Sequence, residues 1–412
     1  MEISISILAV GALVFLAHLF SALFEKTRIP DVLPLLFIGL IAGPILHIIP
    51  SEAFGAIGPV FTVIALIVIL FYTGLEMDLS DLRNSAATGL TVTAINFAAS
   101  VAAIAIIAAM LLDYSLLEAM ALGAIVGGTS SAVVIPITAR LALDGEVKTA
   151  LVLESTLSDV LCIVFALAFI KAAQIHSINP GLIVGQIVSS FVLATVIGIL
   201  AALFWSAILG KVRLFENSTF TTPAFVFVVY GIAEMLGYSG AIAAFAFGIL
   251  LGNVHSINVP SLARNLPAKL IRLNTLEKAF FSELVFLLKT FFFVYIGLML
   301  SFKSIPNFLI GFGLSAVLYG ARFPVVRLSF RKQLSAYDRF IAVTMIPKGL
   351  AAAVLASLVA ASGLPSGAQT QDIVYSVVLC TITISSLLAF IADKKFKPDT
   401  TGSPPGPAGT YT

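Results

Sequence analysis

The sequence has few charged residues, and this shortage excludes most soluble proteins. Charged residues make up 11% of the 412 residues, whereas soluble globular proteins contain roughly 25%. Hydrophobic residues make up 59% of the chain, which indicates a protein that crosses a lipid bilayer many times. The net charge of +2 is too small to suggest a nucleic-acid partner.

Cysteines and catalytic motifs are also scarce. The only two cysteines, Cys162 and Cys380, lie in apolar runs without a CxxC or CxxxH pattern, which argues against a disulfide framework or a metal site of that kind. The sequence contains no Walker motif and no suitable pair of nucleophile and base, so it favours neither an ATP-driven pump nor a membrane enzyme. We therefore expect a protein that is not an enzyme and that needs no cofactor.

The two ends of the chain carry no sign of a soluble domain. The first apolar stretch, at about 3–24, lacks a basic n-region and a small-residue cleavage site, so we interpret it as a retained membrane span. Residues 394–412 are rich in proline and glycine and are expected to form a short, disordered cytoplasmic tail. A transporter-like sensor would need a large soluble domain, and none is expected here.

Apolar runs separated by charges or turn residues predict an all-α polytopic membrane protein with about thirteen transmembrane helices, each of roughly 20 residues. The predicted spans are 3–24, 31–47, 56–74, 86–112, 116–139, 147–173, 180–208, 220–236, 239–254, 279–301, 305–328, 338–362 and 371–393.

The distribution of basic residues predicts the orientation, because lysine and arginine concentrate in cytoplasmic loops. With the N-terminus outside, 18 of the 23 basic residues fall in inner loops, and only Lys171 and Lys303 lie outside. The remaining three, Lys289, Arg322 and Lys348, fall inside spans. We therefore expect a multi-pass protein of the cell (inner or plasma) membrane, surrounded by the lipid bilayer, with its C-terminus in the cytoplasm.

Two pairs of short motifs recur in the same order and suggest an internal repeat. FIGLIAG (37–43) resembles FGILLG (247–252), and LFYTGLEM (70–77) resembles FFVYIGLM (292–299). They predict two six-helix repeats, at about 3–173 and 220–393, joined by a linker helix at about 180–208. Because a single linker helix joins the repeats, equivalent helices of the two repeats cross the membrane in opposite directions. Such inverted repeats are typical of secondary transporters.

Two of the predicted spans contain residues that interrupt a helix. GGTSSAVVIP (127–136) combines two glycines, three hydroxyl side chains and a proline, and MIPKGL (345–350) combines proline, lysine and glycine. Small residues also line tight contacts between membrane helices, which is the simpler interpretation of the first motif. Because both motifs occupy corresponding positions, we favour discontinuous helices, the fifth and twelfth, whose freed backbone groups face an ion.

The span at 147–173 carries four polar residues within LESTLSD (153–159). On a helix, Asp159 and Ser155 share one face, and Glu154 and Ser158 share the neighbouring face. An ionisable residue near the middle of a span is costly unless it meets water, an ion or a partner.

We expect Asp159 to lie near the hydroxyls of Ser155 and Thr129, because a carboxylate with hydroxyl and carbonyl oxygens suits a hard monovalent cation such as Na⁺ or K⁺. Burial disfavours a bare carboxylate, so the same group can bind a proton instead. A site that holds a cation or a proton, but not both, can exchange one for the other.

The remaining intramembrane charges have a structural interpretation. Glu154 is expected to form an ion pair with Arg322, or less readily with Lys289 or Lys348. Arg322 could alternatively extend its side chain to the inner surface. Lys348 lies at the second interruption, where its charge would neutralise the C-terminal ends of half-helices.

Six motifs together resemble the monovalent cation:proton antiporter superfamily, in particular the sodium/proton exchanger family. They occur in the family's order over roughly residues 5–390 and are LIAGPI (40–45), FYTGLEMDL (71–79), GGTSSAVVIP (127–136), ESTLSD (154–159), FFVYIGL (292–298) and MIPKGLAAAVL (345–355). The resemblance implies a core domain with crossed, unwound helices 5 and 12, a dimerisation domain, homodimers and elevator-like alternating access. It places the ion-binding carboxylate on Asp159, helping oxygens on Thr129 and Ser155, and the structural pair on Glu154 and Arg322.

The sequence departs from the family at one position in the site. Relatives usually carry Asn-Asp or Asp-Asp where this chain has Ser158-Asp159, and members with a single aspartate tend to be electroneutral. The resemblance therefore implies a one-for-one exchange of Na⁺ (or Li⁺) for H⁺. We count Ser158 among the ion- or proton-binding residues, and it bears on the choice of cation. A potassium/proton antiporter and a channel-like potassium efflux protein are the alternatives.

Overall fold

The computed structural model describes residues 2–27, 32–49, 57–77, 86–175, 180–215, 218–254, 271–300, 305–330 and 334–395. These residues form fifteen α-helices and no β-strand. The helices are α1 (Glu2–Thr27), α2 (Val32–Leu40), α3 (Ile57–Glu76), α5 (Ala86–Leu111), α6 (Leu116–Ile125), α7 (Ser131–Arg140), α8 (Gly145–Ile175), α9 (Pro180–Val212), α10 (Thr221–Met235), α11 (Gly240–Gly252), α13 (Thr275–Met299), α14 (Ile305–Ser329), α15 (Ala336–Thr344), α16 (Leu350–Ala361) and α17 (Gly367–Lys395).

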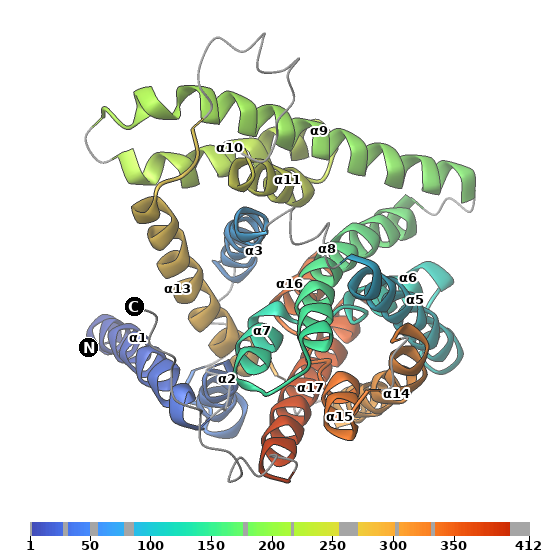
Figure 1. Ribbon diagram of the computed structural model, residues 1–412. Coiled ribbons are helices and arrows are strands. Elements are labelled where there is room, and N and C mark those ends of the chain that lie inside the picture. The colour runs from blue at the N-terminus through green and yellow to red at the C-terminus, as the bar shows by residue number, and fades with distance from the viewer. Residues whose placement is uncertain are drawn as a thin grey trace, which may run out of the picture.

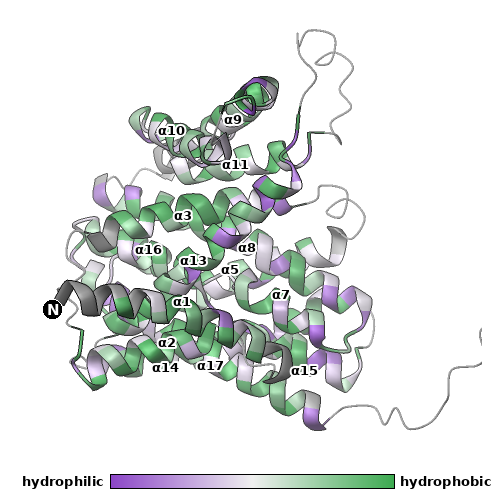
Figure 2. Ribbon diagram, turned by 90° about the vertical axis from the view of Figure 1, so that its left-hand side faces the viewer, coloured by the Kyte–Doolittle hydropathy of each residue, from purple (hydrophilic) through white to green (hydrophobic). Residues whose placement is uncertain are grey.

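The lengths and composition of these helices confirm the prediction of an all-α polytopic membrane protein. Most residues of the helices are hydrophobic, as the ribbon colours show (Figure 2). Six of the described helices are long and apolar enough to cross a membrane unaided, namely Thr88–Leu111, Gly145–Gln174, Val188–Val212, Thr275–Met299, Ile305–Ser329 and Gly367–Ala392. The other apolar helices are shorter. Thirteen crossings and the orientation of the chain therefore stay predictions, and the predicted disordered tail lies largely outside the described residues.

The helices pack into two bundles, and each half of the sequence contributes to both (Figure 1). One, the scaffold bundle, contains α1, α2, α3, α9, α10, α11 and α13. The other, the site bundle, contains α5, α6, α7, α8, α14, α15, α16 and α17. Between the bundles, α3 packs on α16, and α8 packs on α9 and α11. In Figure 1, α9 lies along one edge of the molecule, and α14 and α15 lie toward the opposite edge.

Two helices of the site bundle are interrupted, at the two motifs where the sequence predicts a break. Ser115 caps the start of α6 through a capping box with Glu118, and α6 ends after Ile125. Residues 126–130, which include two glycines, separate α6 from α7. Residues 345–349, which include Pro347, separate α15 from α16. Each break falls within an apolar stretch, so its backbone groups must find partners inside the protein.

Candidate ion-binding site

The two breaks lie against each other inside the site bundle. The backbone N–H of Ser130 donates to the carbonyl of Pro347 at 2.7 Å, which joins one unwound segment directly to the other. A second link is made by the Lys348 amine, which donates to the carbonyl of Gly128 at 2.6 Å. The interrupted helices α6–α7 and α15–α16 therefore meet at their unwound segments.

The close approach of the two breaks depends on the absence of a side chain at Gly349. A Cβ atom at this position would overlap the Ser130 hydroxyl and would lie 2.5 Å from the Ser130 Cβ. Gly349 is also the N-cap of α16, where its backbone leaves the helical conformation. The glycine of the MIPKGL motif is thus required by its contact with the other motif.

The charged groups at this meeting point complement the ends of the half-helices. The carboxylate of Asp159 lies beside the first residue of α7, Ser131, where unpaired N–H groups make the helix end positive. The fully buried Lys348 amine bonds to Gly128, just beyond the negative C-terminal end of α6. The backbone N–H of Lys348 donates to the Thr381 hydroxyl at 2.9 Å, so α17 holds this segment in place.

Asp159 projects from α8 and is half-buried. One of its carboxylate oxygens, Oδ2, accepts a hydrogen bond from the Ser131 hydroxyl at 3.0 Å, and Lys348 lies near enough for the two opposite charges to attract. Ser131 was not among the predicted ligands, although it belongs to the same 127–136 motif. The helical period relates residues within one helix, so it gives no guide to which hydroxyl next to a break in another helix faces α8.

The other three predicted oxygen donors are buried and bonded within the protein. Ser158 accepts a hydrogen bond from the Thr129 N–H at 2.9 Å, and the two hydroxyl oxygens are 3.2 Å apart. The Ser155 hydroxyl donates to the carbonyl of Val152 at 2.9 Å. Ser158 therefore fastens α8 to the unwound segment after α6. The assignment of Thr129, Ser155 and Ser158 as ion ligands stays a prediction.

Glu154 on α8 and Arg322 on α14 form a buried, bidentate ion pair within the site bundle. The guanidinium nitrogens Nη1 and Nη2 lie 2.5 and 2.6 Å from the carboxylate oxygens Oε1 and Oε2. The third nitrogen, Nε, donates to the carbonyl of Ala342 at 3.0 Å. Arg322 exposes 0% of its surface and Glu154 1%, so the arginine does not extend to the membrane surface. This is the pairing that the sequence resemblance implies.

The two intramembrane lysines, Lys348 and Lys289, do not pair with Glu154 in the structure. Lys348 bonds to Gly128, as described above. Lys289 lies on α13 in the scaffold bundle and is half-buried, with its amine 5.9 Å from the centre of the Phe286 ring. The described residues contain no group of three or more His, Cys, Asp or Glu side chains that could hold a metal ion. The site thus offers a single carboxylate, hydroxyl oxygens and unwound backbone, which suit a hard monovalent cation or a proton.

Two interrupted helices that meet beside a carboxylate within a membrane define a class, the secondary ion transporters. The chain belongs to the sodium/hydrogen exchanger transmembrane family, whose model matches residues 11–394. This match confirms the family resemblance found in the motifs.

Individual relatives agree with this family and differ in their named cation. The chain is similar to Na(+)/H(+) antiporter 1 of Methanocaldococcus jannaschii, with 27% identity over 327 residues, which cover 75% of this chain and 72% of the relative. It is also similar to the K(+)/H(+) antiporter NhaP2 of Shewanella sp. (strain ANA-3), with 24% identity over 92% of this chain and 65% of that protein. Among solved structures, the sodium proton antiporter MjNhaP1 of M. jannaschii shares the fold, with a TM-score of 0.71, 24% identity and coverage of 96% and 98%.

Proposed function

We propose that the protein is a secondary antiporter that exchanges a monovalent cation for H⁺ across the membrane. The observation that carries this proposal is the position of Asp159, whose carboxylate lies where two interrupted helices meet and accepts a hydrogen bond from Ser131. The neighbouring acid, Glu154, is already bonded to Arg322 on both oxygens. Asp159 is therefore the carboxylate that binds the cation and the proton in turn.

The stoichiometry follows because Asp159 alone binds the ion or the proton, while Glu154 stays paired with Arg322. A carboxylate can neutralise one cation or bind one proton, and the low dielectric surroundings disfavour leaving it bare. Each movement of the site across the membrane then carries one positive charge in either direction. We infer a one-for-one exchange without net charge transfer, with Asp159 and Ser131 as ligands and with Thr129 and Ser155 as further oxygen donors.

The two bundles support an elevator-type movement, in which the site bundle moves relative to the scaffold bundle. The packing also supports the inverted repeat. Gly39 on α2 fits against Gly297 on α13, and Gly74 on α3 fits against Gly248 on α11, so closely that a Cβ on any of the four would overlap the backbone of the opposite helix. By the sequence motifs α2 corresponds to α11 and α3 to α13, so the contact between α2 and α13 is equivalent to the contact between α11 and α3. Such reciprocal packing is expected of two repeats related by a two-fold axis.

The surroundings of the transporter belong to the same proposal. The charge distribution favours an extracellular N-terminus and a cytoplasmic C-terminus in the cell membrane. The family resemblance favours a homodimer. Both are tested by labelling of single cysteines from each side of the membrane and by crosslinking in the membrane.

The identity of the cation has two candidates. We favour Na⁺, with Li⁺ as a possible substitute, because the relative named for Na⁺ aligns at the higher identity of the two compared above, 27%. K⁺ is the second candidate, because the relative named for K⁺ aligns at 24% identity over 92% of this chain. A channel-like potassium efflux protein would use the same carboxylate for selectivity but would move no protons in return.

Exchange is tested with the purified protein in lipid vesicles that contain a pH-sensitive dye. Pulses of Na⁺, Li⁺ or K⁺ are applied while the membrane potential is clamped. The proposal expects a cation-dependent change of internal pH without a matching current. Dye signals that ignore the cation, or a current equal to the cation flux, would contradict electroneutral exchange.

The role of Asp159 is tested in the same vesicles with Asp159→Asn, which keeps the shape of the side chain and removes its charge. We expect exchange to stop while the melting temperature stays close to that of the parent protein. Asp113→Asn is the matched control, since Asp113 is exposed and has a positive φ of 54° that asparagine also adopts. Parental exchange in Asp159→Asn would remove this residue from the mechanism.

A further inference from the structure

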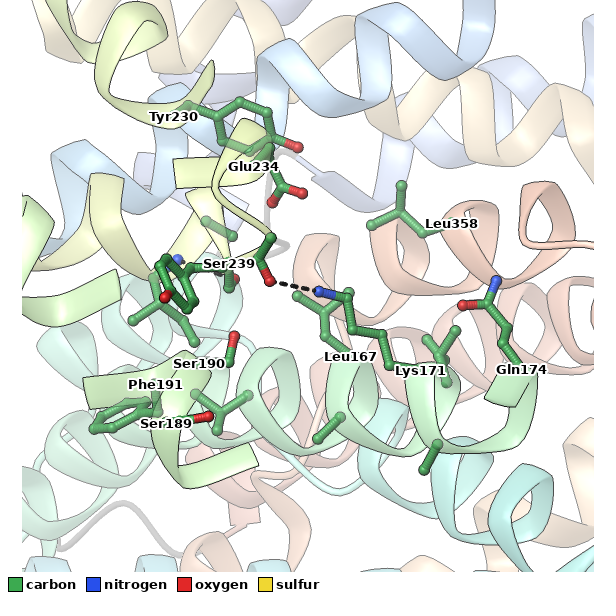
Figure 3. A pocket seen from close by; sticks show the side chains of 18 of the residues that line it. Leu167, Lys171, Gln174, Ser189, Ser190, Phe191, Tyr230, Glu234, Ser239 and Leu358 are labelled. Atoms are coloured by element: carbon green, nitrogen blue, oxygen red, sulfur yellow. Dashed lines mark hydrogen bonds between the residues drawn. The ribbon is translucent and has the colours of Figure 1, made fainter. Parts of the chain in front are cut away.

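A cavity of about 660 Å³ separates the two bundles near one end of α8 (Figure 3). Its walls come from α8 and α16 of the site bundle and from α3, α9, α10 and α11 of the scaffold bundle. The cavity lies toward the C-terminal end of α8, beyond Val164, which the charge distribution predicts to face outward.

A hydrogen bond across this cavity joins the bundles. The amine of Lys171, on α8, donates to the carbonyl of Gly237, in the turn between α10 and α11, at 3.1 Å (Figure 3). Lys171 is exposed, and the stem of its side chain lines the cavity. The ammonium group also lies at the C-terminal end of α10, where unpaired carbonyls make the helix end negative.

The acceptor of this bond is held in a fixed position. Gly237 has a φ of +83°, the left-handed conformation that ends a helix. One carboxylate oxygen of Glu234 accepts a hydrogen bond from the Gly240 N–H at 2.7 Å, and the Ser239 hydroxyl accepts one from the Ile242 N–H at 3.4 Å. The turn is therefore pinned at both ends, so the Gly237 carbonyl moves with the scaffold bundle.

The donor is likewise tied to its own bundle. One turn further along α8, the Gln174 amide donates to the carbonyl of Ser362, directly after α16, at 2.8 Å. This bond fixes the end of α8 to the site bundle. A change in the distance between Lys171 and Gly237 therefore reports a movement of one bundle against the other.

We propose that Lys171 is a latch that holds the two bundles together at this end of the molecule and that must release for the site bundle to move. The latch rests on the proposed alternating-access function, and it deepens that function by naming a residue that sets the balance between the two arrangements. Lys171 contacts neither the ion nor Asp159. It is a positioning residue, and its loss favours arrangements in which the cavity is open.

The latch is tested by the rate at which a cysteine inside the cavity reacts with a bulky, water-soluble maleimide. The reporter is Ser190→Cys on α9, a half-buried residue that lines the cavity, in purified protein in nanodiscs with both faces accessible. Protein without the reporter measures the background from Cys162 and Cys380, which are both buried. Because the reaction needs no ion gradient and no particular orientation, it is independent of transport.

Lys171→Met removes the donor and keeps the apolar stem, and we expect it to accelerate labelling of the reporter about two- to fivefold, as the loss of one partly exposed charged hydrogen bond implies. Lys171→Arg retains a donor and is expected to label at the parental rate. Lys148→Met is the matched control, since it removes a lysine from the opposite end of the same helix.

If the reporter is labelled no faster in Lys171→Met than in the parent protein, the latch proposal is wrong. This holds whether both proteins react or neither does. Equal acceleration by Lys148→Met would also overturn it, because the effect would then follow from charge on α8 alone. A protein that shows the expected labelling but no exchange in vesicles would keep the latch and refute antiport. Normal exchange without the labelling difference would keep antiport and refute the latch.

Discussion

The ion pair between Glu154 and Arg322 gives a large and specific stability prediction. Arg322 is completely buried, and its guanidinium donates two hydrogen bonds to Glu154 and one to the carbonyl of Ala342. Glu154→Ala removes the first two and leaves a buried cation with a single backbone partner. Breaking a buried pair in this way costs about 3–5 kcal/mol. We expect the melting temperature in detergent to fall on the order of 5 °C or more.

The double variant Glu154→Ala with Arg322→Met is the control that separates charge from packing. It removes both charges and replaces the arginine with an apolar side chain, so most of the lost stability should return. If Glu154→Ala melts like the parent protein, the pair does not hold the site bundle together. If that variant also loses exchange, Glu154 acts in transport and the structural interpretation is wrong.

Three further substitutions test the meeting point of the interrupted helices. Ser131→Ala should raise the cation concentration for half-maximal exchange about three- to tenfold, because Asp159 loses its hydroxyl neighbour; unchanged exchange kinetics would exclude Ser131 as a ligand. Ser158→Ala should lower the free energy of unfolding by about 1–3 kcal/mol, because a buried N–H loses its acceptor, and an unchanged melting curve would contradict this. Gly349→Ala should abolish the monodisperse peak in size-exclusion chromatography, whereas Gly320→Ala, with open space around its Cβ, should not; equal behaviour would argue against the close contact.

The helices could be located from sequence because apolar runs of the length needed to cross a bilayer are hard to mistake. The predicted span at 116–139, for example, becomes α6 and α7, and the glycines and hydroxyls within it mark the break between them. The division into two bundles could not be predicted. It depends on which apolar faces fit together, as α3 does with α11, and hydrophobicity alone does not distinguish between apolar partners inside a membrane.

The site was predictable where a charge or a helix-breaking residue stands out against apolar surroundings. Asp159 and Glu154 were found because an ionisable group in a membrane span needs a partner. The partners themselves were harder to find. Lys348 reaches the carbonyl of Gly128, 220 residues away, and the first turn of α7 presents Ser131 to the carboxylate, where the sequence predicts Thr129. Contacts with backbone acceptors and irregular segments do not depend on a pattern of side chains, so the sequence does not predict them.

The central claim, that one carboxylate binds either the cation or the proton, is tested most directly by counting protons released when the cation binds. Na⁺ is added to purified protein in weakly buffered detergent solution at a pH where the site is protonated, and the pH change is recorded. The wild-type protein should release up to one proton for each cation bound, and Asp159→Asn should release none and bind no cation. Parental proton release from Asp159→Asn, or cation binding by the wild-type protein without proton release, would contradict competition at this residue.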